Sequence, residues 1–558
     1  MHANHPPTRL PWWTRTLDLI AVALFALALV SIIAGGVRIS LGGLVLSVTR
    51  PQRPAIEASV ILLIRAVIWR GRGAVGRLPL VLILAVFTVG LVSDSTPRRV
   101  GDAGEYMVMA MSLGRLSGPA VAASDIDRFS YAAWANDYWF TMASPGPRGQ
   151  DTRQDFTHFW FYPLLAAPFV RLAEALGAHP NYGFTVLNVL LLLVTAWVLG
   201  RRLDVASVLL LVGGPILWWL DKAHTEVFTF SMLAVGMTLL KGSPWWTMVA
   251  FGAAATQNPP IVAALFLTLA WALFVQRRRD LPVWVGAAAG IALALLHPLY
   301  YALRLGIWSP LRLSVVPHWP GVAELTAVLW DPNLGILVFT PVFTLAIAVG
   351  VVALVVKTRG HPEWPEVWFA ALLGLFFLFS FAQTGNANSG ATFNPSRYGL
   401  WLLPLSVPLL VRINEVWGAD RARWLRVAAV LALVHASLAF QPRFAENYVK
   451  PSRPARWLWT VHPSFDNPLP EVFCERVSEH DGEGVLPVAT AGCEKALLAG
   501  AGSAEVVWPP QCRPVPVPAE CARAGALCYA NRAASGYSFA RAPSQPAFVY
   551  TLAVFGQR

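Results

Sequence analysis

The stretch LPLVLILAVFTVGLVSDSTPRRVGDAGEY, residues 78–106, joins a hydrophobic run to an acidic segment. The run from Leu78 to Val92 carries no charge and is read as a membrane span. Asp102 and Glu105 open the amphipathic stretch that follows, and their spacing of three residues places both carboxylates on one face of a helix. The pattern predicts that a membrane ends just after this run and that a long polar loop begins there.

The composition of the whole chain agrees with a membrane protein. Of its 558 residues, 56% are hydrophobic and 13% are charged, whereas soluble domains carry about 25% charged residues. We therefore expect most of the chain to be buried in lipid. The net charge of +12 does not indicate a nucleic-acid partner, because the basic residues form small clusters between apolar runs and no continuous stripe.

Apolar runs recur along the chain and predict its architecture. Runs of about 20 residues, or fewer where a helix is tilted, are read as spans. The predicted spans are 18–36, 57–70, 78–93, 182–200, 205–220, 226–240, 244–257, 260–275, 281–300, 334–356, 366–383, 399–412 and 425–441. They predict an all-α polytopic membrane protein with about 13 transmembrane helices over residues 1–441. Residues 442–558, with strand-like pieces such as Phe548 to Phe555, predict a small C-terminal extracytoplasmic domain of mixed or irregular structure.

Basic clusters orient the predicted spans. Short loops rich in Lys and Arg face the cytoplasm, and with a cytoplasmic N terminus seven basic clusters fall on that side. The clusters are Arg9 and Arg15; Arg70, Arg72 and Arg77; Arg201 and Arg202; Lys241; Arg277, Arg278 and Arg279; Lys357 and Arg359; and Arg421, Arg423 and Arg426. An odd number of spans then places the tail outside. This predicts a multi-pass protein of the plasma (inner) membrane with an extracytoplasmic tail.

The cysteines support the same orientation. All of them lie in the tail, as Cys474, Cys493, Cys512, Cys521 and Cys528. Such clustering is typical of an oxidising, extracytoplasmic compartment. We expect at least one disulfide, with short loops closed among the last three cysteines and Cys474–Cys493 as a plausible second pair. At least one cysteine must stay unpaired within the chain because the number is odd.

The first long outer loop, 94–181, contains a further apolar segment, Phe156 to Leu176. Counting this segment as a span would invert every later basic cluster, so we predict an interfacial helix that lies on the membrane. His158 lies near its start, among aromatic residues that suit the membrane interface or stacking against a sugar. A structural role is the alternative for His158, as it is for His318 in the outer segment 301–333.

The acidic pair of this loop is the first candidate for chemistry. Asp102 and Glu105 could accept a proton from a membrane-borne substrate. The alternative is that both are first-turn acids that interact favourably with the helix dipole.

The second candidate is the segment DKAHTE, residues 221–226, between two predicted spans on the outer side. Glu226 begins an apolar run, and an ionisable residue at the mouth of a membrane helix is a functional candidate. The alternative is a surface turn with a local Asp221–Lys222 pair, which contributes little. That alternative fits Asp221 and Lys222 better than it fits His224 and Glu226.

Arg397 and Tyr398 form the third candidate, just before the predicted span 399–412. An arginine on the outer side runs against the positive-inside trend. A phosphate partner would explain it, because Arg binds phosphate through two parallel hydrogen bonds. The alternative is an Arg-Tyr pair at the membrane interface.

Together these motifs resemble the C-type (GT-C) glycosyltransferase superfamily, whose members are integral membrane enzymes that use polyprenyl-phosphate sugars. Protein O-mannosyltransferases and lipid A aminoarabinose transferases belong to it. The family's acidic residue in the first outer loop, with its amphipathic helix, looks like Asp102 to Leu116. Its Pro-containing juxtamembrane segment looks like His158 to Pro168.

The resemblance extends over roughly residues 15–440. The family's second acidic position looks like Glu226, or less well Asp221, and its late Arg-Tyr before a Pro-containing helix looks like Arg397 to Pro404. This chain departs from many relatives in separating its first two acids by Ala-Gly. The choice of base therefore stays open between Asp102 and Glu105.

The resemblance implies a hexosyl or pentosyl transferase that moves a sugar, with inversion, from a polyprenyl-phosphate donor to a glycan, lipid or protein acceptor outside the membrane. A carboxylate, Asp102 or Glu105, would be the base, with Glu226 assisting. The substrate-binding residues would be His224, Arg397 at the donor phosphate, Tyr398, His158 and Asp221. No cofactor is required, although a divalent cation between Asp102 and Glu226 is an alternative.

Two other functions compete with this interpretation. A transporter or flippase of a lipid-linked glycan would place charges near the bilayer midplane within inverted repeats, and the sequence shows its acids at the predicted membrane edge and no repeat. A polysaccharide polymerase or ligase would also act outside on lipid-linked sugars, usually with a large loop late in the chain.

Overall fold

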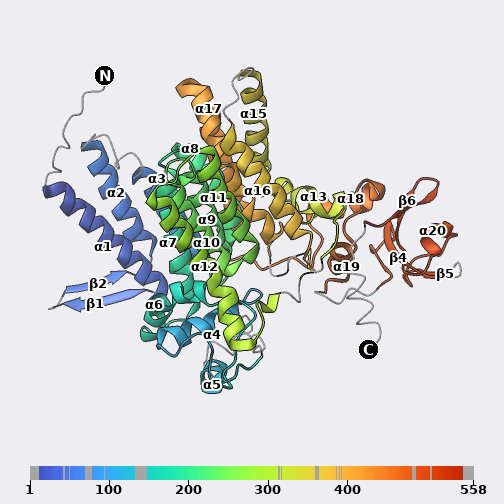
Figure 1. The fold of residues 1–558 in the computed structure, drawn as a ribbon, viewed down its shortest axis with the longest axis horizontal. Helices are drawn as coiled ribbons and strands as arrows, with labels where there is room; N and C mark the ends of the chain where they lie inside the picture. The colour runs from blue at the N-terminus through green and yellow to red at the C-terminus, as the bar shows by residue number, and fades with distance from the viewer. Residues whose placement is uncertain are drawn as a thin grey trace. The chain divides into compact units, whose positions relative to one another are not determined.

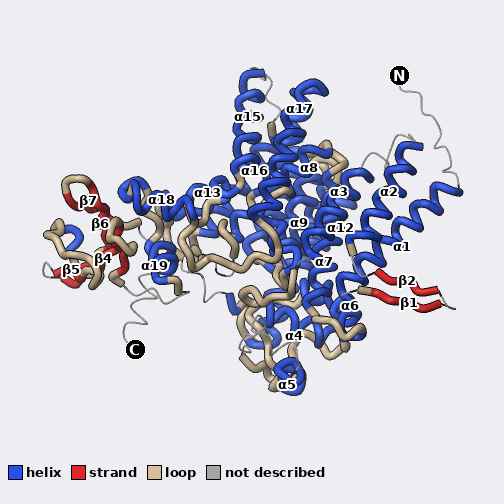
Figure 2. Tube along the Cα trace, turned by 180° about the vertical axis from the view of Figure 1, so that it is seen from behind, coloured by secondary structure: helices blue, strands red, loops and turns tan. Residues whose placement is uncertain are grey.

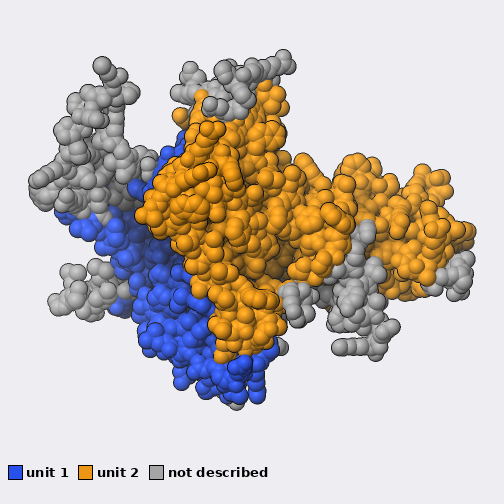
Figure 3. All heavy atoms as spheres, viewed as in Figure 1, with its two compact units in different colours: residues 1–156, 160–231, 433–443 blue, residues 157–159, 232–432, 444–558 orange. Residues whose placement is uncertain are grey.

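The computed structural model of the chain describes residues 12–34, 36–41, 44–48, 51–68, 78–93, 95–131, 147–311, 315, 317–357, 364–384, 386–388, 390, 392–480, 486–502 and 505–543. The chain divides into two compact units, coloured separately in Figure 3. The first comprises Met1–Phe156, Trp160–Ser231 and Leu433–Arg443, and the second comprises Thr157–Phe159, Met232–Ala432 and Phe444–Arg558. The second unit contains both later helices and the tail, so a separate domain over 442–558 stays a prediction.

Helices dominate the first unit (Figure 1). Within it, α1 packs against α2, α2 against α3, and both α4 and α7 against α6. Its elements are α1 (Trp12–Ala34), the hairpin of β1 (Val37–Leu41) and β2 (Leu44–Val48), α2 (Gln52–Ile68), α3 (Leu78–Ser93), α4 (Ala103–Gly114), α5 (Ala123–Tyr131), α6 (Phe161–Ala175), α7 (Asn181–Leu199), α8 (Val205–Val212), the 3₁₀ helix η3 (Pro215–Asp221) and the start of α9 (Glu226–Leu239).

The second unit continues with helices that include short 3₁₀ and π segments. Here α10 packs along α12, and α11 and α13 pack against α16. The elements are α10 (Pro244–Gln257), η4 (Pro259–Ile261), α11 (Val262–Ala270), the π-helix η5 (Trp271–Val275), α12 (Leu281–Leu305), α13 (Val322–Trp330), α14 (Ile336–Phe339), α15 (Pro341–Lys357), α16 (Pro365–Phe381), η7 (Arg397–Trp401), η8 (Leu403–Ser406) and most of α17 (Val407–Ala439).

A small antiparallel sheet forms the end of the second unit (Figure 2). Its strand order is β3-β4-β6-β7, and β5 pairs with β4. Alternation along β4 sends Leu497 to one apolar cluster, with Trp459 and Phe473, and Leu498 to another, with Trp508. The elements are α18 (Arg453–Val461), η9 (Pro463–Phe465), α19 (Pro470–Ser478), β3 (Val488–Ala489), β4 (Lys495–Gly502), β5 (Glu505–Val507), α20 (Ala519–Ala522), β6 (Leu527–Ala533) and β7 (Gly536–Arg541).

The predicted fold class, an all-α protein with about 13 membrane spans, is wrong. In the described part of the chain, two helices are long and apolar enough to cross a membrane, α7 and α12. Other apolar runs form helices of only 10–17 residues. The sheet of the second unit lies within residues 488–541, inside the tail for which mixed or irregular structure was predicted, whereas the β1–β2 hairpin of the first unit was not predicted.

Two of the predicted spans are interrupted by breaks in the helix. The run 205–220 is split by Gly213, Gly214 and Pro215 into α8 and a 3₁₀ helix, because proline lacks an N–H and glycine weakens a helix interior. The run 399–412 likewise begins as two 3₁₀ segments, η7 and η8, before α17 starts. The prediction took each hydrophobic run as one continuous helix, whereas the helix is broken within these two runs.

The helices predicted for the first outer loop are confirmed. Helix α4 occupies most of Asp102 to Leu116, and α6 occupies most of Phe156 to Leu176. The interfacial position predicted for α6 stays a prediction. The strand predicted over Phe548 to Phe555 lies outside the described residues.

The disulfide prediction is confirmed, but one of its pairings is wrong. Cys493 bonds Cys512 and Cys521 bonds Cys528, with Cα–Cα distances of 5.7 and 5.6 Å. Cys474 forms no disulfide and is buried on α19. It cannot pair with Cys493 because the two lie in different apolar clusters of the sheet, with Cys474 beside Phe473 and Cys493 beside Cys512.

The Cys493–Cys512 bond closes a loop of 19 residues beside the central strands. Replacing both cysteines by alanine is expected to destabilise the sheet by about 3 kcal/mol, since the bond limits the unfolded chain. Hydrogen exchange of the β4 and β6 amides measures this loss. Cys474→Ala is the matched control, because it removes a buried thiol and no cross-link. Equal exchange in both variants would show that the disulfide contributes nothing beyond its volume.

Candidate functional site

Four of the predicted site residues come together in the first unit, where the start of α4 meets the turn that leads into α9. The His224 Nε2 atom lies 4.0 Å from an Asp102 carboxylate oxygen, and His224 Nδ1 lies 3.5 Å from a Glu226 carboxylate oxygen. Glu105 lies one helical turn beyond Asp102. Residues more than 100 positions apart in sequence therefore form one cluster.

The start of α4 fixes the acidic pair. Asp102 is the residue before the helix, and its backbone carbonyl accepts the Glu105 and Tyr106 N–H groups. Gly101 precedes it with a φ of 49°, a left-handed conformation that favours glycine. Carboxylate oxygens of Asp102 and Glu105 lie within 4.8 Å of each other. The two acids could therefore both contact one substrate hydroxyl or one cation.

Burial separates the roles that these groups can take. The Asp102 side chain is 33% exposed, whereas the His224 and Glu226 side chains are 1% and 2% exposed. Glu105 is also buried. Asp102 is thus the member of the cluster most accessible to a molecule that approaches from outside.

The two nitrogens of the His224 ring face different groups. The backbone N–H of Thr225 lies 3.1 Å from Nδ1, and a Glu226 carboxylate oxygen lies 3.5 Å from the same nitrogen. The other nitrogen, Nε2, faces Asp102. Their separation of 4.0 Å exceeds a direct hydrogen bond by about 1 Å. An oxygen atom of a substrate could lie within hydrogen-bond reach of both.

Aromatic rings enclose the histidine. The ring centroids of Tyr106 and Trp219 lie 5.7 and 5.0 Å from that of His224. Tyr162 packs edge-on against Tyr106 and donates to the Asn188 side-chain oxygen at 2.8 Å. Burial raises the pKa of Tyr162, so its phenol stays neutral. These rings hold the imidazole in place and exclude water from its buried side.

Two asparagines of α7 hold the 219–222 backbone. Asn188 donates to the carbonyl oxygens of Trp219, Leu220 and Lys222, and Asn181 donates to that of Asp221. Helix α6 approaches α7 closely at Gly183, where a Cβ atom would lie 2.4 Å from the backbone nitrogen of Val170. Only glycine fits there without a shift.

The Asp221–Lys222 pair is buried and is not the surface turn considered from the sequence. The Lys222 ammonium donates to the Asp221 carboxylate and to the Pro442 carbonyl, and it lies 4.6 Å from the Trp218 ring centroid. Burial raises the pKa of Asp221, and the Lys222 charge opposes this rise. Both side chains are at most 3% exposed, so Asp221 acts here as the buried counter-ion of Lys222. A contact between Asp221 and the substrate stays a prediction.

The other predicted residues belong to the second unit. His158 lies 3.2 Å from its neighbour Thr157, measured from Nδ1 to the hydroxyl oxygen. The Arg397 guanidinium lies 5.5 Å from the Tyr398 ring centroid, and Tyr398 stacks on Phe381 at 5.2 Å. Convergence of Arg397 with Asp102 stays a prediction.

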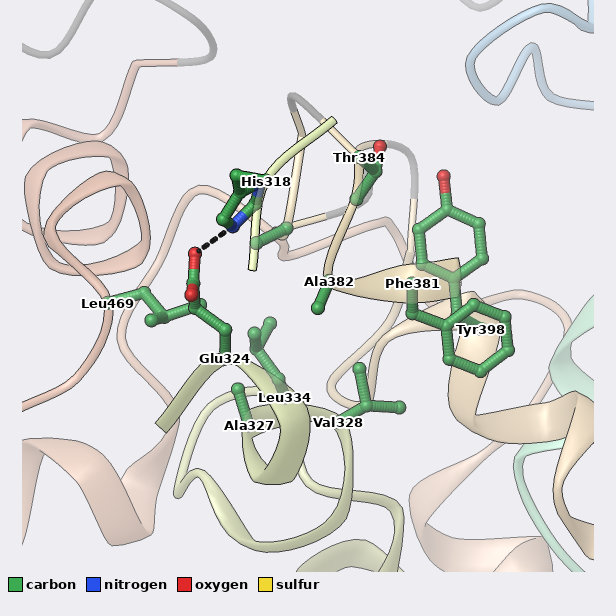
Figure 4. A pocket seen from close by; sticks show the side chains of 11 residues that line it. His318, Glu324, Ala327, Val328, Leu334, Phe381, Ala382, Thr384, Tyr398 and Leu469 are labelled. Carbon is green, nitrogen blue, oxygen red and sulfur yellow. Dashed lines mark hydrogen bonds and ion pairs between the residues drawn. The ribbon is translucent and has the colours of Figure 1, made fainter. Parts of the chain in front are cut away.

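A small cavity of the second unit is lined by Tyr398, Phe381 and the pair His318–Glu324 (Figure 4). His318 Nε2 lies 2.9 Å from a Glu324 oxygen, and the other Glu324 oxygen accepts the Gly321 N–H at 2.7 Å. The volume of about 10 Å³ accommodates roughly one water molecule. The contact with Glu324 agrees with a structural role for His318, which stays a prediction.

Comparisons of the chain with family models, with curated proteins and with solved structures find no match. The resemblance to GT-C glycosyltransferases therefore stays a prediction, and the geometry of the cluster carries the functional argument alone.

Sequence reasoning missed the residues that support the cluster, namely Tyr106, Tyr162, Asn181 and Asn188. One signal was present: Asn188 interrupts the apolar run of α7. A polar side chain in such a run requires a buried partner. The partner is the 219–222 backbone, which a sequence alone does not identify.

Breaking the buried pair tests its structural role. Lys222→Met leaves the Asp221 carboxylate buried without its cation, which is expected to destabilise the protein by about 3–5 kcal/mol. The double variant Asp221→Asn with Lys222→Met removes both charges and should recover most of this loss. Thermal unfolding of the purified full chain measures both changes. A double variant as unstable as the single one would contradict the ion-pair explanation.

Proposed function

We propose that the chain is a membrane glycosyltransferase of the GT-C type, which moves a sugar from a polyprenyl-phosphate donor to an acceptor outside the membrane. The observation that carries the proposal is the cluster of Asp102, His224 and Glu226 in the first unit. A one-third-exposed carboxylate beside a buried His–Glu pair is an arrangement suited to accepting a proton from a hydroxyl or amine.

Asp102 is the base in this proposal, since it is the more accessible of the two loop acids. The acceptor oxygen or nitrogen attacks the anomeric carbon of the donor sugar and loses its proton to the Asp102 carboxylate. The bond from the anomeric carbon to the phosphate oxygen breaks, and its electron pair leaves with the lipid phosphate. One displacement inverts the anomeric centre and needs no covalent enzyme intermediate.

His224 and Glu226 position the reacting group. A sugar or acceptor hydroxyl placed between His224 Nε2 and Asp102 would accept from the imidazole and donate to the carboxylate. A Glu226 carboxylate oxygen lies 3.5 Å from His224 Nδ1, where a carboxylate would stabilise the imidazolium if the ring gained a proton. A lipid phosphate is a workable leaving group, so the proposal requires no metal. Asp102 and Glu105 are close enough to share a cation in a metal-dependent variant of the mechanism.

The proposal includes an orientation in the plasma (inner) membrane, with the N terminus in the cytoplasm and the tail outside. The two disulfides of the tail support an oxidising compartment for that end. Opposite sides for the two ends require an odd number of crossings. At least one of the shorter apolar helices would therefore cross the membrane in addition to α7 and α12.

Asp102→Asn tests the base. It preserves the shape of the side chain and removes the proton acceptor, so sugar transfer should fall by roughly 10²–10⁴-fold. The assay is transfer from a polyprenyl-phosphate sugar by the full chain in proteoliposomes, with protein yield measured in parallel. Asp127→Asn, at an exposed acid of α5, is the matched control and should retain full activity.

Full transfer by the Asp102→Asn variant would remove this residue from catalysis and shift the role to Glu105 or Glu226. If the wild-type chain moves lipid-linked glycans across vesicles and forms no glycosidic bond, the protein is a flippase and the proposal fails.

Arg397→Ala tests the donor phosphate. If the guanidinium binds the phosphate, the variant should raise the KM for the donor by about tenfold or more, because a hydrogen bond to a charged group is lost. Arg278→Ala is the control, since Arg278 is an arginine of the same unit that pairs with Asp280. An unchanged donor KM would remove Arg397 from the site and leave the role of Asp102 intact.

A further inference from the structure

A second cavity, of about 200 Å³, opens in the second unit among the ends of several helices. It lies at the segment after α9, the π-helix η5, the first turn of α16 and the start of α17. Its polar and aromatic lining consists of Lys241, Trp271, Gln276, Trp364, Glu366 and Arg412. None of these residues has a role in the proposed transfer reaction.

The π-helix builds one wall of this cavity. Residues Trp271–Val275 form a single wide turn at the end of α11, a feature that often marks functional sites. Gln276, which follows it, donates through its side chain to the Lys241 carbonyl at 2.9 Å. This hydrogen bond fixes the backbone at Lys241 beside the cavity.

The charges of the lining suit a phosphate group. The lining of the cavity contains two cationic side chains, Lys241 and Arg412, and one acidic side chain, Glu366. Lysine and arginine are the side chains that bind phosphate most strongly. Arg412 also pairs with Glu415 at 2.7 Å, which orients its guanidinium. The carboxylate of Glu366 could accept a hydrogen bond from a hydroxyl or amine attached to the phosphate.

An apolar stripe begins where the cavity ends. Glu366 and Val367 line the cavity, and Trp368 is the next residue of α16. Trp368, Leu372 and Leu375 recur at helical spacing on one face and are 70%, 54% and 66% exposed. A ligand with its phosphate in the cavity could therefore extend an apolar chain along this helix.

We propose that this cavity binds the headgroup of a glycerophospholipid, with the phosphate at Lys241 and Arg412 and an acyl chain along α16. The volume is below the roughly 300–1,000 Å³ of drug-sized pockets, so it admits a headgroup and leaves the chains outside. Basic pockets between apolar helices are known features of lipid recognition. The site is independent of the proposed transfer reaction and of the residues that perform it.

Binding of a short-chain phosphatidylglycerol to the purified full chain tests the site. The double variant Lys241→Gln with Arg412→Gln should weaken binding by about tenfold or more, since it removes two charge-assisted contacts. Arg523→Gln, at an exposed arginine of the tail in the same unit, is the control for the loss of a cation. Glu415→Gln is the control for the loss of the Arg412–Glu415 pair, which as an exposed pair contributes little. Binding by the double variant equal to that by the Arg523 variant would overturn the proposal.

The apolar stripe distinguishes a lipid from a soluble phosphate. Leu372→Ser with Leu375→Ser should weaken binding of the lipid while the cavity charges stay in place. Inorganic phosphate, titrated against the bound lipid, should compete only weakly. Complete displacement by millimolar phosphate, together with unchanged lipid binding by the stripe variant, would show a free-phosphate site and overturn the lipid assignment.

Discussion

The ion pair of Asp221 and Lys222 is the constraint on which the candidate site depends. An ammonium and a carboxylate are buried together there, and the ammonium also binds the Pro442 carbonyl. This contact ties the turn before α9 to the segment that follows α17. Removing either charge would leave the other without compensation in a medium of low dielectric constant. The pair therefore fixes the backbone from which His224 and Glu226 project.

The three acids of the cluster have similar chemistry but differ in their burial. Glu226 and Glu105 are buried, whereas Asp102 is partly exposed at the start of α4. A buried carboxylate must be satisfied by fixed partners, and that makes it a good positioning group. An exposed one can exchange partners with a substrate. This exposure is the reason that the proposed mechanism takes Asp102, and not Glu105, as the base. The spacing in the sequence left that choice open.

Several features could be predicted from local sequence, and others could not. Helix α4 follows from the amphipathic pattern after Asp102, and α6 follows from the apolar segment that ends at Leu176. The presence of disulfides follows from the clustered cysteines. The pairing of those cysteines depends on which face of the sheet each one occupies, which is not a local property. The meeting of Asp102 with His224 is likewise set by tertiary packing. Apolar runs gave the wrong number of spans because length was inferred from hydrophobicity alone.

The break in one predicted span, 205–220, also shapes the candidate site. Gly213, Gly214 and Pro215 end α8 early and turn the chain into a 3₁₀ helix, which leaves backbone carbonyls without helical partners. Buried carbonyls need donors, and Asn188 supplies them through its side-chain amide. A continuous helix would have satisfied these groups internally and carried His224 away from the start of α4. The broken helix, its asparagine and the ion pair together fix the turn from which His224 and Glu226 project.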